Sequence, residues 1–359
     1  MDIKKAYQQQ IQAEWGHLAD YWYPLVETNC LAKNAMIKVK AFNFNYLVWK
    51  NKQGEVSVFL DTCCHKQAPL SQGRLLQNQL SCPYHGWQFD HQGDCSNIPY
   101  STEPSDCDKK SLVKLGSKNS GGIIWFFPGD QALENNEKDK PTYHDWQTLT
   151  GDIVKTEEFD CDEQALIENF MDSPHTNFIH SGLIRKPKQL KTREIAIYLD
   201  AQQKLMVDHL PSDETLGPFN WFINPSKNPT HHQDMFIAPS QVDIQYQFEK
   251  DKTNFRTQII MCPIDHNKTR AFFKISCQFR LFNPLIRLGL KLFLPLVLKQ
   301  DKNIVALQFN NPSKLSQFKG DFIDYDLYSY QVKLLREQAK TKQPSLGLIS
   351  SVHRTSLKL

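Results

Sequence analysis

The pattern of apolar and polar residues divides the chain into two halves of different character. After a polar stretch over residues 1–20 that has helical character, short apolar runs separated by turn residues continue to about residue 130. Residues 46–50 and 56–60, for example, flank Asn51-Lys52-Gln53-Gly54, which is a hairpin signal. This succession of short strands predicts a small all-β domain over residues 21–130.

The second half combines alternating segments with longer helical ones. Several segments alternate apolar and polar side chains, as half-buried strands do. Strands are predicted at residues 195–199, 205–210, 241–248, 255–262 and 271–279, and helices at residues 165–178, 290–309 and 325–340. Helices grouped on one side of an antiparallel sheet indicate an α+β fold.

The same changes of pattern predict the domain boundaries. Residues 131–150 are charged and rich in turn formers, so we expect a linker there. We also expect a helical lead-in over residues 1–20, a second domain over residues 151–345 and a C-terminal tail over residues 346–359.

Composition narrows the function classes. The 359-residue chain has a formal net charge of only +3, which gives no sign of nucleic-acid binding. Its nine cysteines lack the spacing of a disulfide framework, as expected in a reducing compartment. The amino terminus lacks the apolar core of a signal peptide, and no apolar run reaches the length of an integral membrane span. We therefore expect a cytoplasmic protein.

One apolar segment, residues 281–298, comes near to spanning length. It is interrupted by Arg287 and Lys291, whose charges are costly at bilayer depth, and by Pro284 and Pro295. We interpret it as a helix hairpin or kinked helix that packs on the core. The alternative is an apolar flap that makes peripheral contact with a membrane or lines an apolar substrate entrance.

Two short segments each offer one cysteine and one histidine. Cys63-Cys64-His65 is followed, after sixteen residues, by Cys82-Pro83-Tyr84-His85. Thiolate and imidazole suit zinc, copper or iron–sulfur sites. Structural zinc sites usually pair like with like, whereas each segment here carries a mixed pair. The pattern favours a [2Fe-2S] cluster with Cys63 and Cys82 on one iron and His65 and His85 on the other, and a Cys2His2 zinc site is the alternative.

The flanking residues resemble a known domain. Ala68-Pro69-Leu70-Ser71 follows the first segment, and Gly86-Trp87 continues the second. These residues, together with the ligand pattern, resemble the Rieske domain of ring-hydroxylating oxygenases.

A second group of metal-binding residue types lies at Asp172, His175 and His180. On a helix Asp172 and His175 are one turn apart and share a face. His180 would lie about 140° round an ideal helix from His175. Both histidines can bind one metal only if the helix ends or distorts between them. Two histidines and a carboxylate downstream of an iron–sulfur cluster indicate a mononuclear non-haem iron.

This group also resembles Rieske oxygenases, which carry the pattern Glu-Asn-x-x-Asp-x-x-His-x-x-x-x-His. His175 and His180 resemble two legs of a facial triad, whose carboxylate the family takes from a helix more than a hundred residues downstream. Residues 299–305 resemble that helix, which selects Asp301. Gln300 departs from the family, which often has an acidic residue there. Rival carboxylates in a more loop-like segment are Asp321, Asp324 and Asp326.

The resemblance covers residues 20–340 and implies a Rieske non-haem iron oxygenase of the homotrimeric monooxygenase or demethylase type. It implies that residues 151–345 form a helix-grip-like catalytic domain with Fe(II), and that O2 is a substrate. It further implies that Asp172 bridges His85 of one subunit and His175 of the next. The chain shows no dinucleotide fingerprint, so a separate reductase or ferredoxin must supply electrons. A basic surface that an acidic carrier could contact is predicted at Lys66, Lys109, Lys110 and Lys114.

The expected substrate is a small, largely apolar organic molecule that is hydroxylated or oxidatively demethylated. Its pocket should lie between the sheet and the helix that carries Asp301. Plausible apolar walls are Phe219, Trp221, Phe222, Met235, Phe236, Ile259 and Met261. Two other classes remain: a Rieske electron-transfer protein without oxygenase activity, and a zinc-stabilised binding module. An intact set of His175, His180 and Asp301 separates the oxygenase from the electron carrier, and visible absorption by the cluster separates it from the zinc protein.

Overall fold

A computed structural model of the chain describes residues 2–32, 35–133, 146, 152–181, 183, 190–212, 224, 228–248, 255–277, 283–315 and 320–359. The chain folds into two compact units, Met1–Gln147 and Thr148–Leu359. The division falls within the predicted linker, most of which lies outside the described residues.

The first unit begins with helix α1 (Ile3–Trp15) and a 3₁₀ turn (Gly16–Ala19), where a helical lead-in was predicted. The buried side chains of α1 recur every four residues, so one face of the helix packs on the unit: Tyr7, Ile11 and Trp15. The Tyr7 hydroxyl donates to the carbonyl of Pro128 (2.7 Å) and lies 2.9 Å from the Tyr46 hydroxyl, which ties the helix to the sheet.

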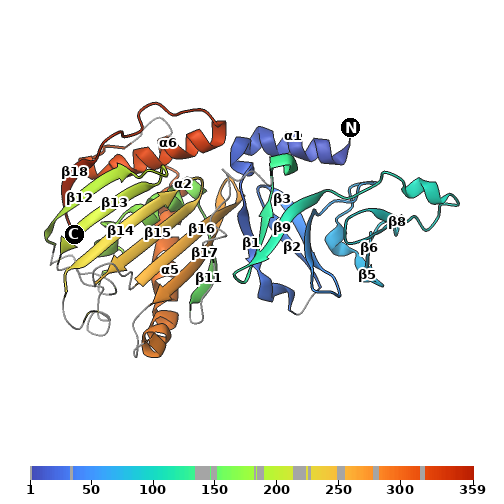
Figure 1. Ribbon diagram of the computed structural model, residues 1–359, viewed down its shortest axis with the longest axis horizontal. Coiled ribbons are helices and arrows are strands. Elements are labelled where there is room, and N and C mark those ends of the chain that lie inside the picture. The colour runs from blue at the N-terminus through green and yellow to red at the C-terminus, as the bar shows by residue number, and fades with distance from the viewer. Residues whose placement is uncertain are drawn as a thin grey trace. The chain divides into compact units, whose positions relative to one another are not determined.

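Two antiparallel sheets form the rest of this unit (Figure 1). The larger has the strand order β1-β10-β9-β4-β3-β2 and the smaller has the order β5-β6-β7-β8. The strands of the larger sheet are β1 (Tyr23–Glu27), β2 (Met36–Ala41), β3 (Phe44–Lys50), β4 (Val56–Leu60), β9 (Lys114–Ser120) and β10 (Ile123–Phe127). Those of the smaller are β5 (Arg74–Leu76), β6 (Gln79–Ser81), β7 (Gln88–Phe89) and β8 (Cys95–Asn97). The predicted hairpin is confirmed as β3–β4.

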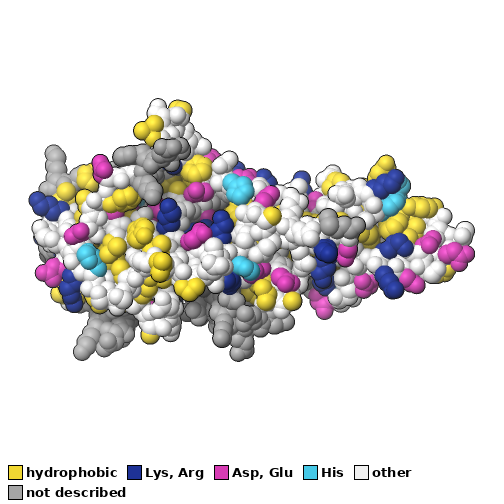
Figure 2. All heavy atoms as spheres, turned by 90° about the horizontal axis from the view of Figure 1, so that it is seen from above, with side chains coloured by type: hydrophobic (Ala, Val, Ile, Leu, Met, Phe, Trp, Pro, Cys, Tyr) yellow, Lys and Arg dark blue, Asp and Glu magenta, His cyan; other side chains and the backbone are white. Residues whose placement is uncertain are grey.

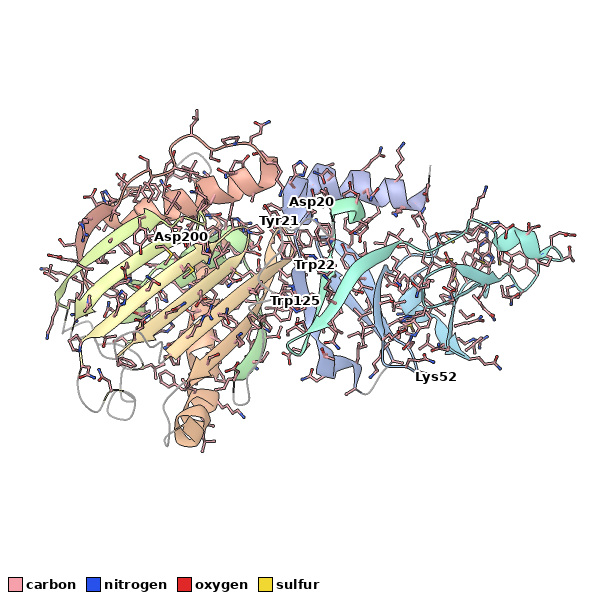
Figure 3. The ribbon with its side chains drawn as sticks, viewed as in Figure 1. Asp20, Tyr21, Trp22, Lys52, Trp125 and Asp200 are labelled. Atoms are coloured by element: carbon pink, nitrogen blue, oxygen red, sulfur yellow. The ribbon has the colours of Figure 1, made fainter. Side chains whose placement is uncertain are left out.

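Aromatic side chains fill the β1–β10 side of the larger sheet (Figure 3). Trp125 is fully buried, and its Nε1–H donates to the carbonyl of Ser120 (3.1 Å). The ring of Trp22 packs edge-on against Phe127 at 5.8 Å. By contrast, Lys52 lies in the polar turn between β3 and β4 (Figure 3). The apolar core of this unit is therefore formed by side chains of the strands, whereas the turns between strands can carry polar residues and metal ligands.

The second unit is an eight-stranded antiparallel sheet with helices on one face (Figure 1). The strand order is β11-β17-β16-β15-β14-β13-β12-β18. The strands are β11 (Ile153–Phe159), β12 (Thr192–Leu199), β13 (Leu205–Ser212), β14 (Thr230–Ile237), β15 (Gln241–Gln247), β16 (Phe255–Asp265), β17 (Lys268–Cys277) and β18 (His353–Lys358). Asp200 lies just after β12, in its turn to β13 (Figure 3).

The helices are α2 (Glu163–Met171), α3 (His175–Phe178), α5 (Asn283–Phe309) and α6 (Leu327–Thr341). Residues of the three long helices share one buried cluster with the inward side chains of the sheet: Leu166 and Phe170 of α2, Leu298 and Val305 of α5, Val332 and Leu335 of α6. The expected α+β fold, with an antiparallel sheet and grouped helices, is confirmed.

Five strands of this sheet were predicted, and β11, β14 and β18 were not. The predicted C-terminal tail is wrong, because His353–Lys358 pair along β12 as an edge strand. The sequence of β18 is mostly polar, so its stability comes from backbone pairing that hydropathy does not reveal. Strand β14 was missed because its buried positions include Thr230, His232 and Asp234.

The described part of the apolar segment, residues 283–298, does not form a hairpin, which was one of the two forms that we considered for it. Helix α5 continues from Asn283 to Phe309 with Pro295 inside it, and that proline is on the exposed side. Among the described residues, no helix is both long and apolar enough to cross a bilayer.

Candidate metal centres

Tight turns hold the two Cys/His segments of the first unit. The N–H of Cys63 donates to the carbonyl of Ala68 (2.9 Å), and the N–H of Cys82 donates to the carbonyl of Trp87 (2.8 Å). Gly86 closes the second turn by donating to the carbonyl of Cys82 (3.1 Å), with a φ of 73° that favours glycine. Cys63, Cys82 and Trp87 belong to one buried cluster, so both turns rest on a packed base.

The rings of the two segments face one another. The centroids of His65 and His85 are 4.8 Å apart, and His65 stacks on Trp87 at 4.5 Å with an interplanar angle of 8°. The Trp87 Nε1–H donates to the Tyr100 hydroxyl (2.8 Å). The buried Nδ1 atom of His65 has no hydrogen-bond partner among the described residues, as expected of a nitrogen that binds a metal. Two buried thiols and two adjacent imidazoles fit the donor set of a Rieske cluster.

The helix predicted over residues 165–178 is interrupted before His175. Helix α2 ends at Met171, and α3 begins at His175. Pro174 explains the break, because it has no N–H to donate and its ring would collide with the carbonyl of Phe170 in a continuous helix. Asp172 accordingly has non-helical dihedrals (φ −90°, ψ 89°). The change that the sequence required between the two histidines is a helix end, because α3 ends at Phe178, before His180.

His175 and His180, on either side of the end of α3, both approach Asp301. The Nε2 atoms of His180 and His175 lie 3.1 Å and 3.5 Å from Oδ1 of Asp301 on α5. The two imidazole rings are 5.2 Å apart at 74° to one another. All three side chains can therefore direct one ligand atom to a common point. Two imidazoles and one carboxylate are the donor set of a facial-triad iron site.

The other ring nitrogen of each histidine faces an oxygen. Nδ1 of His180 lies 2.9 Å from Oε1 of Gln300, and Nδ1 of His175 contacts the backbone carbonyl of Asp172. These oxygens can only accept, so each Nδ1 carries a proton, and each Nε2 would present its lone pair to a metal ion in place of its hydrogen bond to Asp301. Gln300, which departs from the family pattern, thus supplies the acceptor that orients His180.

Burial and hydrogen bonding set the charge of this group. His180 and Asp301 are almost fully buried. Burial by itself raises the pKa of Asp301, but hydrogen bonds from His175 and His180 outweigh it and lower the pKa to about 2. Burial likewise lowers the pKa of His180, whereas Asp301 raises it with a larger effect. The site is therefore built around an ionised carboxylate.

Asp172 and Asn169 lie next to the triad. Oδ2 of Asp172 is 3.9 Å from Nδ1 of His175, and about a third of the Asp172 side chain is exposed. The Asp172 carboxylate therefore makes no direct hydrogen bond to the His175 ring, which contacts the backbone carbonyl of Asp172 instead. Nδ2 of Asn169 donates to Oδ1 of Asp301 (3.3 Å). The rivals Asp321, Asp324 and Asp326 are not part of this group.

A cavity of about 210 Å³ opens beside the triad. Its walls come mainly from β15–β17 and α5, and they are largely apolar: Ile244, Phe255, Ile259, Phe273, Ile275, Leu290, Phe293, Leu294, Val297 and Leu298. Among the predicted walls, Ile259 lines the cavity. Phe236 and Met261 lie in the general core instead, and Phe219, Trp221 and Phe222 lie outside the described residues.

A second hollow, of about 570 Å³, is lined by one of the three proposed ligands, His175. Asp172 and His175 line both spaces. The remaining walls of the hollow are more polar, and include Glu168, Asn169, Gln308 and Lys314. His175 therefore connects an apolar interior cavity with a polar outer hollow.

A second group of two histidines and one aspartate was missed. His209, His232 and Asp234 are all buried and have their ligand-type atoms close together. The available signal was the run His231-His232-Gln233-Asp234, whose polarity instead hid a strand. His232 and Asp234 also line the apolar cavity.

Family models cover most of both units. Residues 21–114 match the model described as Rieske [2Fe-2S] domain. Residues 159–322 match the vanillate O-demethylase oxygenase C-terminal domain. The first match contains both Cys/His segments, and the second contains His175, His180 and Asp301.

Curated relatives include plant oxygenases. Chlorophyllide a oxygenase, chloroplastic, of Arabidopsis thaliana is 28% identical over 173 residues, which are 47% of this chain and 30% of that protein. Protein TIC 55, chloroplastic, of the same plant is 32% identical over 170 residues, 45% of this chain and 31% of that protein. The chain thus matches about a third of the length of these relatives.

Solved structures share the fold along almost the whole chain. Dicamba monooxygenase bound to 3,6-dichlorosalicylic acid has a TM-score of 0.75 at 21% identity, covering 90% of this chain and 97% of that one. The Pseudomonas putida CBB5 NdmA QL mutant with caffeine has a TM-score of 0.69 at 22% identity, covering 91% and 92%. At these identities the likeness supports the fold.

Proposed function

Because the chain belongs to the Rieske non-haem iron oxygenases, we propose that it is an oxygenase component that hydroxylates or oxidatively demethylates a small, largely apolar substrate. One observation carries the proposal. The Nε2 atoms of His175 and His180 face Asp301 beside an apolar cavity, in a chain that also has the Rieske turns. A pure electron carrier needs the turns but has no use for the triad and its cavity.

The proposed ligands divide between the two units. Cys63, Cys82, His65 and His85 would hold the [2Fe-2S] cluster, and His175, His180 and Asp301 would hold Fe(II). When bound, the cluster supplies single electrons and the iron binds and activates O2. Gln300 and the carbonyl of Asp172 keep the Nδ1 protons in place, so that both histidines present Nε2.

The cavity supports the substrate class. Aliphatic and aromatic side chains of the sheet and of α5 would exclude water and hold an apolar molecule beside the triad. Hydroxylation and oxidative demethylation place the reacting C–H group in the same position, next to the iron. The cavity walls therefore support an apolar class of substrate, and the proposal includes both hydroxylation and oxidative demethylation.

Turnover in the presence of labelled oxygen tests the function. Reduced, iron-replete protein with a surrogate ferredoxin reductase should transfer an atom of ¹⁸O₂ to hydroxylated products of an aromatic and methoxy-aromatic panel, or release formaldehyde from methoxy compounds. Asp301→Ala, which lacks one proposed ligand, should show neither while keeping the visible spectrum of the cluster. Equal product formation by wild type and Asp301→Ala would contradict the proposal.

We propose that electrons arrive from a separate reductase or ferredoxin. Lys66 and Lys109 are exposed on the first unit, and Lys110 and Lys114 are partly exposed. An acidic carrier would be attracted to such a basic surface, most strongly at low ionic strength.

We also propose a homotrimer in which Asp172 links two subunits. His85 is flanked by the exposed aromatic side chains of Tyr84 and Tyr100. Figure 2 shows hydrophobic side chains beside a histidine on the part of this unit that holds β5–β8. Such a surface could dock at the polar hollow of a neighbour, where Asp172 and His175 are accessible. The carboxylate of Asp172 would then join His85 of the partner subunit to His175.

Asp172→Asn tests this bridge. It keeps the backbone carbonyl that contacts His175 and removes only the charge of the proposed link. We expect both metal centres to load normally while substrate-coupled turnover collapses. Near-normal turnover with both centres present would remove the bridge from the proposal.

We propose that the protein works in a reducing compartment, the cytoplasm, because its nine cysteines lack the spacing of a disulfide framework.

Helix α5 supports a further proposal, on membrane contact. Away from the cavity, α5 exposes a leucine stripe: Leu288 (57%), Leu292 (71%) and Leu296 (52%). Exposed Lys291 and Lys299 lie beside it. This combination fits peripheral contact with an anionic membrane surface.

Vesicle flotation tests the contact. Wild-type protein should float with vesicles that contain phosphatidylglycerol, and Leu292→Glu should not. Leu346→Glu is the matched control, because Leu346 is also an exposed leucine but lies between α6 and β18, outside helix α5. A wild-type protein that stays in the soluble fraction would contradict the contact.

A further inference from the structure

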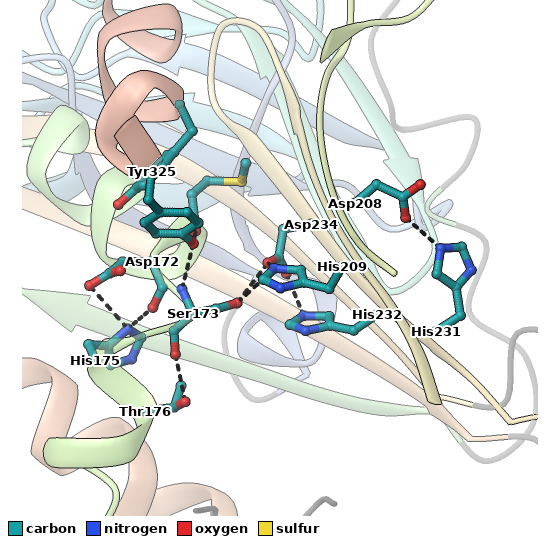
Figure 4. Close-up of polar contacts among 12 residues, drawn as sticks. Asp172, Ser173, His175, Thr176, Asp208, His209, His231, His232, Asp234 and Tyr325 are labelled. Carbon is teal, nitrogen blue, oxygen red and sulfur yellow. Dashed lines mark hydrogen bonds and ion pairs between the residues drawn. The ribbon is translucent and has the colours of Figure 1, made fainter. Parts of the chain in front are cut away.

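The Asp234 cluster (Ser173, His209, His232 and Asp234) joins two strands of the sheet to the segment that precedes His175 (Figure 4). His209 on β13 and His232 on β14 are cross-strand partners, and Asp234 follows on the same face of β14. Oδ1 of Asp234 lies 2.9 Å from Nε2 of His232. Oδ2 lies 3.2 Å from Nε2 of His209 and accepts from the Ser173 hydroxyl (3.0 Å). A buried carboxylate with donors on both oxygens is a firm anchor.

The cluster is arranged to form hydrogen bonds and not to coordinate a metal ion. The rings of His209 and His232 are stacked 4.3 Å apart at 8°, and His232 stacks on Tyr246 on its other face. An imidazole binds a metal ion close to its own ring plane, and two parallel rings in separate planes share no such point. The hydroxyl of Ser173 also lies 3.3 Å from Nε2 of His209, within the space that an ion would need.

Ser173 is held a second time through its backbone. Its N–H donates to the hydroxyl of Tyr325 (3.2 Å), and that hydroxyl donates to the carbonyl of Met171 (3.3 Å). Both neighbours of Asp172 are therefore tied to one buried tyrosine, while the Ser173 side chain is tied to Asp234. The interruption between α2 and α3 is thus fixed from two directions.

Fixing this interruption has a consequence for His175. The carbonyl of Asp172 contacts Nδ1 of His175, and this contact keeps the proton on Nδ1. If Ser173 moved, the peptide between Asp172 and Ser173 would turn and the carbonyl would leave the ring. Nε2 of His175 would then be less well directed at the point that it shares with His180 and Asp301.

We propose that the Asp234 cluster is a clamp on Ser173 that positions Asp172 and His175 for iron binding. In this role Asp234 is a positioning residue that acts through Ser173 and touches no metal. The inference rests on the proposed function only in taking His175 as an iron ligand. It gives a function to three buried polar side chains, His209, His232 and Asp234, in an otherwise apolar part of the sheet.

A thermodynamic cycle tests the clamp. Wild type, Ser173→Ala, Asp234→Asn and the double variant are stripped of mononuclear iron with the cluster retained, and their affinity for Fe(II) alone is measured by anaerobic equilibrium dialysis. Each single variant should bind Fe(II) about tenfold more weakly, at the lower end of the loss known for residues that support metal ligands. The double variant should lose no more than Ser173→Ala, because the two changes break one connection. Ser173→Thr, which keeps the hydroxyl, should recover most of the affinity.

Asp208→Asn is the matched control. Asp208 pairs with His231 on the same two strands, but that pair is partly exposed and does not reach Ser173 (Figure 4). It should bind Fe(II) like wild type, and visible absorption and circular dichroism should show an intact cluster and fold in every variant. Equal affinities in all four proteins of the cycle, or losses that simply add, would overturn the clamp alone. Absence of Fe(II) binding by wild type would overturn both the clamp and the proposed function.

Discussion

The second unit contains two groups of identical composition, each with two histidines and one aspartate, and only one is arranged to hold a metal ion. In the group of His175, His180 and Asp301, two residues come from helices α3 and α5, His180 comes from the turn after α3, and the rings stand at 74°. In the Asp234 cluster the residues come from adjacent strands and the histidine rings are parallel within 8°. Ring orientation therefore separates them where composition, burial and distance do not.

The supporting elements explain the difference. Cross-strand neighbours on one face of a sheet stand side by side, so their rings tend to stack. A short helix and the turn that follows it can instead direct side chains to a point that a facing helix reaches from another side. The end of α3 at Phe178 gives this second geometry, and the adjacent strands supply the anchor that fixes the interruption at Pro174. One group is suited to bind the metal and the other to hold the metal-binding segment.

Asp301→Ala and Asp234→Asn should separate the two groups most strongly. Removing Asp301 leaves two neutral imidazoles, so we expect Fe(II) affinity to fall by more than about 100-fold, beyond the range for residues that only support ligands. Asp234→Asn should cost about tenfold at most, because its effect passes through Ser173. Equilibrium dialysis with iron analysis measures both. Comparable losses in the two variants would mean that the groups are not distinguished by their geometry.

The sequence was informative where chemistry depends on residues close together in the chain. Both Cys/His segments and the Asp172–His180 pattern are local, and the structure brings His175, His180 and Asp301 together as anticipated. Asp301 could be selected only through the resemblance, because nothing in the 120 positions between His180 and Asp301 shows which acid folds back. His209 and Asp234 could not be found, because their proximity depends on the pairing of β13 with β14. The polar inward face of β14 also removed the alternation by which strands are recognised.

Substitution of Gln300 should have an intermediate effect on Fe(II) affinity, because Gln300 contacts only one of the two histidine rings, that of His180. Gln300→Leu removes the acceptor at Nδ1 of His180 without touching Asp301, so the ring can change its tautomer and orientation. We expect Fe(II) affinity to fall about 10–100-fold, as for other partners of metal-bound histidines. Gln300→Glu keeps an acceptor and adds the charge common in the family, so it should bind at least as tightly as wild type. If leucine and glutamate behave alike, the orientation of Nδ1 does not matter at this site.

The smallest effect expected is on the pH dependence of stability, and it belongs to the Asp234 cluster. Burial by itself raises the pKa of Asp234, but the charge of His232 and hydrogen bonds from both imidazoles outweigh it and hold the pKa well below its usual range. A carboxyl group with a lower pKa in the folded state stabilises the fold above its unfolded value, about 3.9, and loses that contribution as the pH falls through the folded value. Wild type should therefore exceed Asp234→Asn in urea midpoint near neutral pH, and the difference should shrink below about pH 4. Tryptophan fluorescence would follow unfolding, with visible absorption recording loss of the cluster separately. Asp208→Asn, whose carboxylate is partly exposed, should differ little from wild type at any pH. A difference between wild type and Asp234→Asn that stays constant down to the most acid point would show that hydrogen-bond geometry, and not the charge of Asp234, anchors the cluster.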